Sequence, residues 1–250
     1  MEHSHSHTHS HSHDENSLHK STDLQDYLGE FVYGGIDGSV TTFAVVAGSA
    51  GAGLPVSVVL ILGFANLIAD GFSMSVGAYL STRSERDNYE KHKRIEYEEV
   101  ELIPEKEREE IRDIYRKKGF EGELLEKVVE VITADKDRWV DVMMKEELEM
   151  SLDHKSPLGK ALTTFLAFLV VGLIPLLAYV FNFNNALNPS QLFTLSCVMT
   201  GLAFMFIGWL KARVTHTSYP KAILETLFLG GSAAALSYFV GDLLERIVAG

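Results

Sequence analysis

The chain has 250 residues, of which 46% are hydrophobic and 22% charged, and its formal net charge is −12. Phosphate groups call for a basic protein surface, so this balance argues against a nucleic-acid-binding protein. Cys197 is the only cysteine, which excludes an intramolecular disulfide and a zinc site built from paired cysteines.

Polar residues fill the start of the chain, where residues 1–20 contain seven histidines, mostly alternating with Ser or Thr. Low hydrophobicity predicts a disordered tail over residues 1–26, and histidine-rich tracts can collect transition metals. A purification tag is the alternative, although tags are usually unbroken histidine runs. The tail does not resemble a signal peptide, so the first apolar stretch is expected to direct membrane insertion.

Five apolar stretches follow, each about 20 residues long and therefore long enough to cross a bilayer as a helix. They lie near residues 31–53, 56–80, 158–181, 191–210 and 222–240. The sequence therefore predicts an all-α membrane protein with five transmembrane helices and a helical-bundle insert between the second and third. The expected domains are the tail 1–26, helices one and two in 27–83, the insert 84–155, and helices three to five in 156–250.

Polar residues interrupt the first two of these stretches. Asp37 lies near the start of the first, where a charge without a partner costs about 3 kcal/mol or more, and adjacent glycines permit close helix approach. Asp70 and Met74 are four residues apart in the second, so they share a helix face. Asp37 with Met74 is thus a candidate carboxylate–thioether pair at membrane depth. A helix cap at Asp37 and ordinary packing of Met74 are the structural alternatives.

The insert, residues 84–155, holds 23 of the 34 acidic residues against 15 basic ones. No helix breaker separates it from the second span, so that helix is predicted to continue to about Glu101. Pro104 favours a new helix start and Gly119 a stop. The further helices are expected over 105–118, 122–133 and 136–152, which makes the insert a small helical bundle.

Acidic and thioether side chains recur in the insert at helical spacing. The candidate ligands are Glu96 and Glu99, Glu107 and Glu110, and Met143, Met144 and Glu147. Spacings of three or four residues place each set on one helix face. Carboxylates suit divalent cations, and thioether sulfur shifts the preference toward softer transition metals than Mg²⁺ or Ca²⁺. A solvated acidic surface, with methionines as core filler, is the alternative that spacing alone favours.

Lysine and arginine placement predicts the orientation in the membrane. With five spans and the N-terminus in the cytosol, the insert 84–155 and the loop 211–221 are also cytosolic. This arrangement leaves only Arg246 of the 22 basic residues on the opposite side, where the loops 54–56 and 182–190 are uncharged. The C-terminus would then face away from the cytosol.

Three motifs carry a family resemblance. They are YGGIDGSVTT at 33–42, ADGFSMS at 69–75 and WVDVMMKEEL at 139–148. Together they resemble the vacuolar iron transporter family, and the resemblance covers roughly residues 27–248. It implies five membrane helices per subunit, a homodimer, and a cytosolic metal-binding domain between the second and third helices. It also implies export of Fe²⁺, often Mn²⁺ too, from the cytosol in exchange for protons.

The same resemblance assigns roles residue by residue. It implies that Asp37 and Met74 serve the membrane pathway, and that the insert binds metal through Glu96, Glu99, Glu107, Glu110 and Glu147, with Met143 and Met144 supplying softness. The metal is then a transported substrate, no cofactor is expected, and the protein is not an enzyme. Its partners would be divalent metal ions, protons, the lipid bilayer and a second copy of the chain. The His-rich tail departs from the family pattern.

Other function classes stay open from the residues alone. A membrane-anchored metal sensor or buffer would bind ions without moving them. A ferritin-like di-iron oxidase needs Glu-x-x-His motifs, which residues 84–155 lack. A membrane scaffold would leave Asp37 without a purpose. Iron and manganese both stay open as the transported ion. A plasma membrane and an organelle membrane both stay open as the location.

Overall fold

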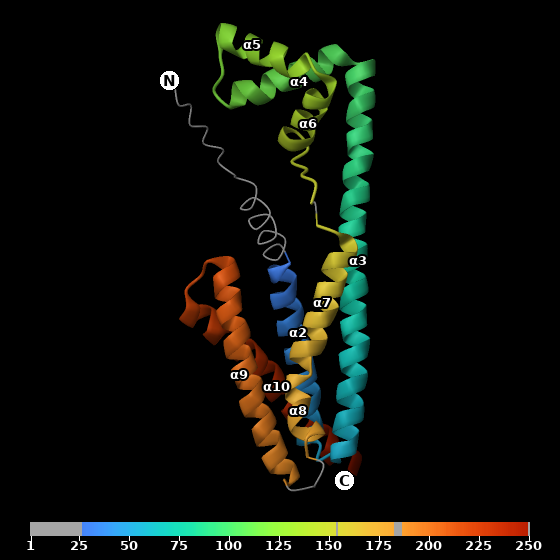
Figure 1. Cartoon of the computed structure of the whole chain (residues 1–250), viewed down its shortest axis with the longest axis vertical. Coiled ribbons are helices and arrows are strands. Elements are labelled where there is room, and N and C mark those ends of the chain that lie inside the picture. Colours follow the sequence, from blue (N-terminus) through green and yellow to red (C-terminus); the bar gives the residue numbers. More distant parts are fainter. Residues whose placement is uncertain (1–26, 154, 183–186, 250) are drawn as a thin grey trace, which may run out of the picture. The chain divides into compact units, whose positions relative to one another are not determined.

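The computed structural model describes residues 27–153, 155–182 and 187–249, and all regular structure in these ranges is helical (Figure 1). The predicted His-rich tail lies outside the described residues. The helices are α2 (Leu28–Gly51), α3 (Val56–Leu102), α4 (Pro104–Lys117), α5 (Gly122–Thr133), α6 (Lys136–Glu146), α7 (Pro157–Gly172), α8 (Ile174–Val180), α9 (Pro189–Thr215) and α10 (Tyr219–Ala249).

The helices form two compact units, one made of the described residues up to Tyr79 and from Pro157 onward, the other of residues 80–156. We call them the membrane unit and the insert unit. Among the described residues, four helices are long and apolar enough to cross a membrane, or five if α7 and α8 form one bent span. The bend between these two helices is 44°, and Pro175 lies in the first turn of α8. Pro175 lacks the backbone N–H that a continuous helix would use at this point, which accounts for the bend.

In the membrane unit, α2 packs against α7, α9 and α10. Its glycines make this contact close, because a Cβ atom at Gly38 would lie 2.5 Å from the carbonyl oxygen of Phe168 on α7. On α10, the Ser237 hydroxyl donates a hydrogen bond of 2.6 Å to the carbonyl oxygen of Ala44 on α2. Small residues at helix contacts are typical of membrane bundles. The predicted close approach around Asp37 is thus confirmed.

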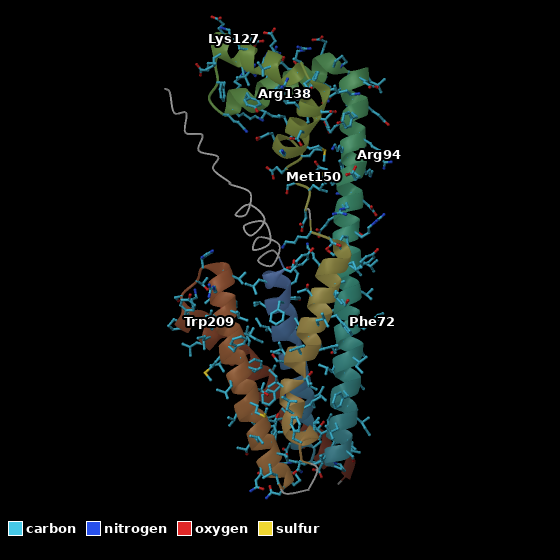
Figure 2. The ribbon with its side chains drawn as sticks, in the orientation of Figure 1. Phe72, Arg94, Lys127, Arg138, Met150 and Trp209 are labelled. Atoms are coloured by element: carbon cyan, nitrogen blue, oxygen red, sulfur yellow. The ribbon has the colours of Figure 1, made fainter. Side chains whose placement is uncertain are left out.

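The helix α3 runs without a break for 47 residues from the second apolar stretch into the insert, which confirms the predicted continuation to about Glu101. Few side chains of its apolar first part are covered by other helices, since only 22% of its most apolar 18-residue stretch is buried. Phe72, for example, is 63% exposed on this helix (Figure 2).

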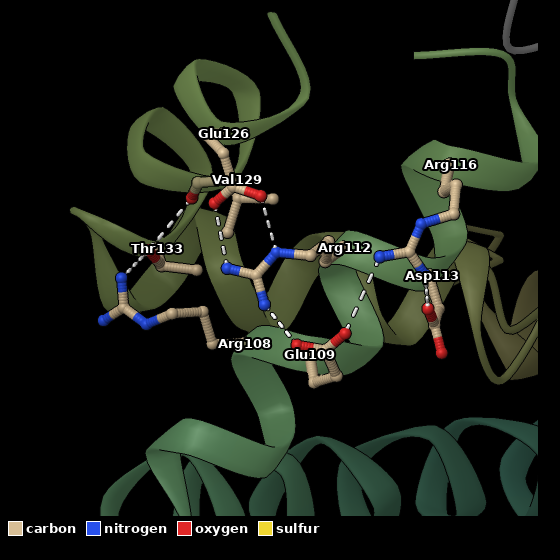
Figure 3. Close-up of polar contacts among 8 residues, drawn as sticks. All are labelled: Arg108, Glu109, Arg112, Asp113, Arg116, Glu126, Val129 and Thr133. Carbon is tan, nitrogen blue, oxygen red and sulfur yellow. Dashed lines mark hydrogen bonds and ion pairs between the residues drawn. The ribbon is translucent and has the colours of Figure 1, made fainter. Parts of the chain in front are cut away.

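The insert unit has an apolar core of its own, to which α3, α4, α5 and α6 contribute buried residues. Arg112 on α4 links two helices through its guanidinium group, which donates to both carboxylate oxygens of Glu126 on α5 at 2.8 and 3.0 Å (Figure 3). Arg108 similarly donates to the hydroxyl of Thr133 at 3.0 Å. The Arg112–Glu126 pair fixes helix orientation more than it stabilises the fold, because the Glu126 side chain is 58% exposed.

One local detail differs from the sequence prediction. The helix expected over 136–152 ends at Glu146, because the chain turns at Glu149, which has a φ of 51°. Leu148 and Met150, on either side of this turn, pack against the insert core. On α5, Leu125, Val129 and Ile132 are buried as a helical face requires, whereas the neighbouring Leu124 is 58% exposed.

Candidate metal centre

Three segments of the insert unit bring the predicted carboxylates together. Glu96 and Glu99 lie on the last two turns of α3, while Glu107 and Glu110 lie on α4, which Pro104 starts two residues after α3 ends. Glu147 directly follows the last residue of α6. The single residue Ile103 connects α3 and α4, and carboxylates from both helices contribute to one cluster.

The five carboxylates form two overlapping groups. One contains Glu96, Glu99 and Glu107, and the other contains Glu107, Glu110 and Glu147. Within each group, one oxygen from every residue lies within 4.8 Å of the others, a spacing that a divalent cation coordinated by oxygen at 2.0–2.6 Å could bridge. Glu107 belongs to both groups, so two ions could share its carboxylate.

Burial sets Glu107 and Glu96 apart from the many exposed acids of the insert. Glu107 is 1% exposed, and neither of its carboxylate oxygens has a hydrogen-bond partner among the described residues. One oxygen of Glu96, Oε2, is likewise buried without a partner. A buried carboxylate without hydrogen bonds is costly unless it is protonated or meets a cation.

The pKa values of these residues report the same cost. Burial, reinforced by the charges of Glu147, Glu99 and Glu110, raises the pKa of Glu96 to about 7. Burial, followed by the charge of Glu110, raises the pKa of Glu107 to about 7. The pKa of Glu147 is also raised, mainly by burial and then by Glu110. Protons therefore occupy part of this site near neutral pH, and a bound cation would have to displace them.

Lys106 is a member of the site that the sequence analysis missed. Its ammonium group lies 2.9 Å from Oε1 of Glu110 and 3.9 Å from Oε1 of Glu107. Because Lys106 is exposed, it can swing away when a metal ion takes its place. The i, i+4 spacing of Lys106 and Glu110 was the available signal.

The two predicted thioether ligands occupy a different environment. Met143 and Met144 are fully buried in the apolar core of the insert unit, beside Trp139 and Val140. Met143 precedes Glu147 by one helical turn on the same segment. Their burial shows that they pack the core, so their part in metal binding stays a prediction.

In the membrane unit, Asp37 lies in the interior of α2, nine residues after the helix begins at Leu28. It therefore cannot be the N-terminal cap of that helix, and the capping alternative is wrong. Among the described residues, its carboxylate has no hydrogen bond or ion pair. The charge of Asp70 on α3 lies close enough to act on Asp37 electrostatically.

Asp70 is the second residue that the sequence analysis did not assign to the site, although its shared face with Met74 was recognised. Asn66, one turn before Asp70, has a buried amide nitrogen without a hydrogen bond among the described residues. Met74 lines a cavity of about 510 Å³ whose walls also include Glu30, Tyr33 and Thr164. The stripe Asn66, Asp70 and Met74 is therefore a polar and thioether face on an otherwise apolar helix.

Comparisons with known proteins agree with the sequence motifs. A family model described as the VIT family matches residues 28–242. A vacuolar iron transporter of Toxoplasma gondii is 36% identical over 252 residues, covering 98% of this chain and 83% of the relative. Vacuolar iron transporter 1 of Oryza sativa subsp. japonica is 34% identical, covering 84% of this chain and 82% of the relative. Vacuolar iron transporter 1 of Arabidopsis thaliana is 31% identical, covering 87% and 86%.

Proposed function

Because the chain belongs to the VIT family, and is a metal-ion transporter by that relationship, we propose that it exports Fe²⁺, Mn²⁺ or both from the cytosol in exchange for protons. The observation that carries the proposal is Glu107, a buried carboxylate without hydrogen bonds that belongs to two groups of acids. A divalent cation would satisfy both groups. No enzymatic activity is expected.

The insert unit would collect the ion. Its excess of acidic over basic residues raises the local concentration of cations near its surface. The Glu96, Glu107 and Glu147 carboxylates would then hold one or two ions, with Glu99 and Glu110 completing the oxygen ligands and Lys106 leaving. Met143 and Met144, if they reach the ion, would favour Fe²⁺ or Mn²⁺ over Mg²⁺.

The membrane unit would move the ion. Asp37 and Asp70 supply two negative charges and Met74 a thioether in the apolar stretches of α2 and α3, where residues 31–80 contain no other acidic side chain. An ionisable residue inside a membrane helix nearly always lines a pathway or pairs with a charge. Asp37 has no such pair among the described residues, which supports a role in the pathway.

Proton exchange follows from competition at the same carboxylates. A carboxylate must release its proton before it binds a metal ion, so the two cations exclude each other at Asp37. A proton gradient directed toward the cytosol would drive the ion out. This competition is the minimum that antiport requires.

Orientation and subunit number complete the proposal. The Lys/Arg asymmetry supports a cytosolic N-terminus and insert, with the C-terminus on the other side. A homodimer is supported by α3, whose membrane part is sparsely packed although it carries Asn66 and Asp70. Polar groups are costly against lipid, so a second copy covering this face would stabilise them.

A sensor or buffer remains the second candidate, because the insert unit alone explains metal binding. Purified full-length protein in proteoliposomes, with a trapped Fe²⁺ indicator and a pH dye, separates the two. We expect Fe²⁺ uptake accompanied by proton movement in the opposite direction, and no uptake in empty vesicles. Stoichiometric binding of Fe²⁺ without flux would support the buffer instead.

A further inference from the structure

One face of α9 changes from apolar to cationic at its C-terminal end. Leu202, Phe206, Trp209 and Arg213 follow one another at helical spacing and all four are exposed, Phe206 by 58%. The Phe206 and Trp209 rings are stacked with centroids 6.1 Å apart, and the Arg213 guanidinium lies 5.9 Å from the centroid of the Trp209 ring. The helix thus presents a lipid-facing stripe that ends in a cation held over an aromatic ring.

Tryptophan prefers the interface between the acyl chains and water, so on a helix long and apolar enough to cross a membrane Trp209 is expected at the membrane surface. Figure 2 labels this side chain on α9. Arg213 is one turn farther along the helix, where lipid headgroups would then be expected. Tyr219, at the start of α10, is also exposed near this end of the unit.

A cavity of about 270 Å³ adjoins Arg213. It is lined by Leu28, Arg213, Val214 and His216, so its wall combines two apolar side chains with two nitrogen-bearing ones. His216 caps α9 with a φ of 52° and is exposed. Neither Arg213 nor His216 has an ion pair in the described part of the chain.

The charge beside this cavity is positive. The sequence contains no acidic residue from Asn188 to Leu224, and Glu225, which ends that run, is paired with Lys211 at 2.9 Å and also feels the charge of Lys221. Arg213 is therefore the basic residue at this cavity whose charge has no acidic partner nearby in the sequence. An arginine guanidinium group without an acidic partner is suited to a phosphate, to which it can donate two parallel hydrogen bonds.

We propose that the Arg213–His216 cavity binds the phosphate of an anionic phospholipid, whose acyl chains lie along Leu202, Phe206 and Trp209. The charge complementarity selects an anion, and the apolar stripe that continues from the cavity selects a lipid over a free phosphate. The site is independent of the metal centre. In the proposed orientation it faces the cytosolic leaflet, where anionic lipids attract basic residues next to membrane helices.

Fluorescence quenching of Trp209 by brominated lipids tests the site in the full-length protein. Two sets of phosphatidylcholine vesicles would be compared, each containing the same mole fraction of one lipid with brominated acyl chains. That lipid is phosphatidylglycerol in one set and phosphatidylcholine in the other. Bromine quenches only tryptophans that contact the chains, and the other tryptophan, Trp139, is buried in the insert core. We expect the anionic lipid to be preferred about fivefold in wild type, and the preference to be lost in Arg213→Gln.

Two further variants keep the result interpretable. His216→Asn removes the imidazole but tolerates the left-handed backbone, so it should reduce the preference without disturbing the end of α9. Arg246→Gln is the matched control, because Arg246 is an exposed arginine near the end of α10 that pairs with Asp242. It should keep the full preference.

Equal quenching by both lipids in wild type, or an undiminished preference in Arg213→Gln, would overturn the proposal. Loss of the preference on adding inorganic phosphate would show a free-anion site and overturn the lipid assignment.

Discussion

The two sets of carboxylates differ in how many ligands they offer a cation. The insert unit gathers five acids from three segments, and Glu107 links them into two overlapping groups. The membrane unit offers Asp37 and Asp70 with a thioether at Met74. A site rich in oxygen ligands holds an ion, whereas a pathway must bind it weakly enough to release it. The difference suggests that the insert selects and stores, and that the membrane helices pass the ion on.

The largest expected effect comes from Asp37→Asn. Asparagine keeps the size and hydrogen-bonding capacity of the side chain but loses the charge and the titratable proton, both of which antiport requires. We expect Fe²⁺ flux in proteoliposomes to fall to the level of empty vesicles, while Mn²⁺ binding to the same preparation is retained. Normal flux with normal proton movement in Asp37→Asn would remove this residue from the pathway and erase the functional contrast between the units.

Asp70→Asn should have a smaller effect on the same flux. Asp70 acts on Asp37 electrostatically, and the loss of a supporting ligand or neighbour typically costs about 10-fold to 100-fold in metal affinity. We expect a raised apparent KM for Fe²⁺ with residual flux. Asn66→Asp is the opposite change, because it adds a carboxylate to the same helix face instead of removing one. If Asp70→Asn transports with unchanged KM, then Asp70 faces lipid or protein without touching the ion.

Glu107→Gln tests whether the insert unit stores the ion. It removes the carboxylate that both groups share, so the affinity of the full-length protein for Mn²⁺ should fall by at least about 10-fold in isothermal titration. Glu105→Gln is the matched control, because Glu105 is an exposed acid on the same helix. Equal losses in the two variants would mean that the insert acts as a diffuse acidic surface.

The pH dependence of stability gives a second test of the insert unit. Glu96 and Glu107 have pKa values near 7, against an ordinary value of 4.5, so the folded state favours their protonated forms. Without metal, their contribution to the free energy of unfolding is largest below pH 4.5 and is lost as the pH rises through 7. Mn²⁺ should therefore raise the thermal midpoint more at pH 8 than at pH 5.5.

Fluorescence of Trp139, which is buried in the insert core, would report this transition in detergent-solubilised protein. The double variant Glu96→Gln, Glu107→Gln should be more stable than wild type at pH 8 without metal, and should lose most of the pH dependence. Metal-free stability that rises between pH 5.5 and 8 would contradict the assigned burial of these two acids.

Much of the fold followed from local sequence features. The continuation of α3 to Leu102 depends on the absence of a helix breaker, and the start of α4 at Pro104 depends on proline geometry, both of which local sequence carries. The end of α6 was missed because apolar residues at helical spacing, Met144 and Leu148, continue past Glu146, whereas the backbone at Glu149 is left-handed with a φ of 51°.

The candidate site could be predicted from local sequence only in part. Spacing placed Glu107 and Glu110 on one face, but it could not show that Glu107 is buried while Glu105 is exposed, because that depends on how α3, α4 and α6 pack. Asp70 was visible as a charge in an apolar stretch. Its closeness to Asp37, on a different helix, required the structure.

Met74→Leu should have the smallest effect, and it tests whether the pathway itself selects among ions. Leucine nearly conserves the volume, so the packing around the cavity lined by Met74 should change little, while one soft ligand disappears. We expect transport to continue with a preference for Fe²⁺ over Mg²⁺ that falls by less than about tenfold. Met205→Leu, at an exposed methionine of α9, is the matched control and should leave the preference unchanged. If Met74→Leu keeps full selectivity while Glu107→Gln loses it, then selection belongs to the insert alone, and the membrane carboxylates act only as a path for ions already chosen.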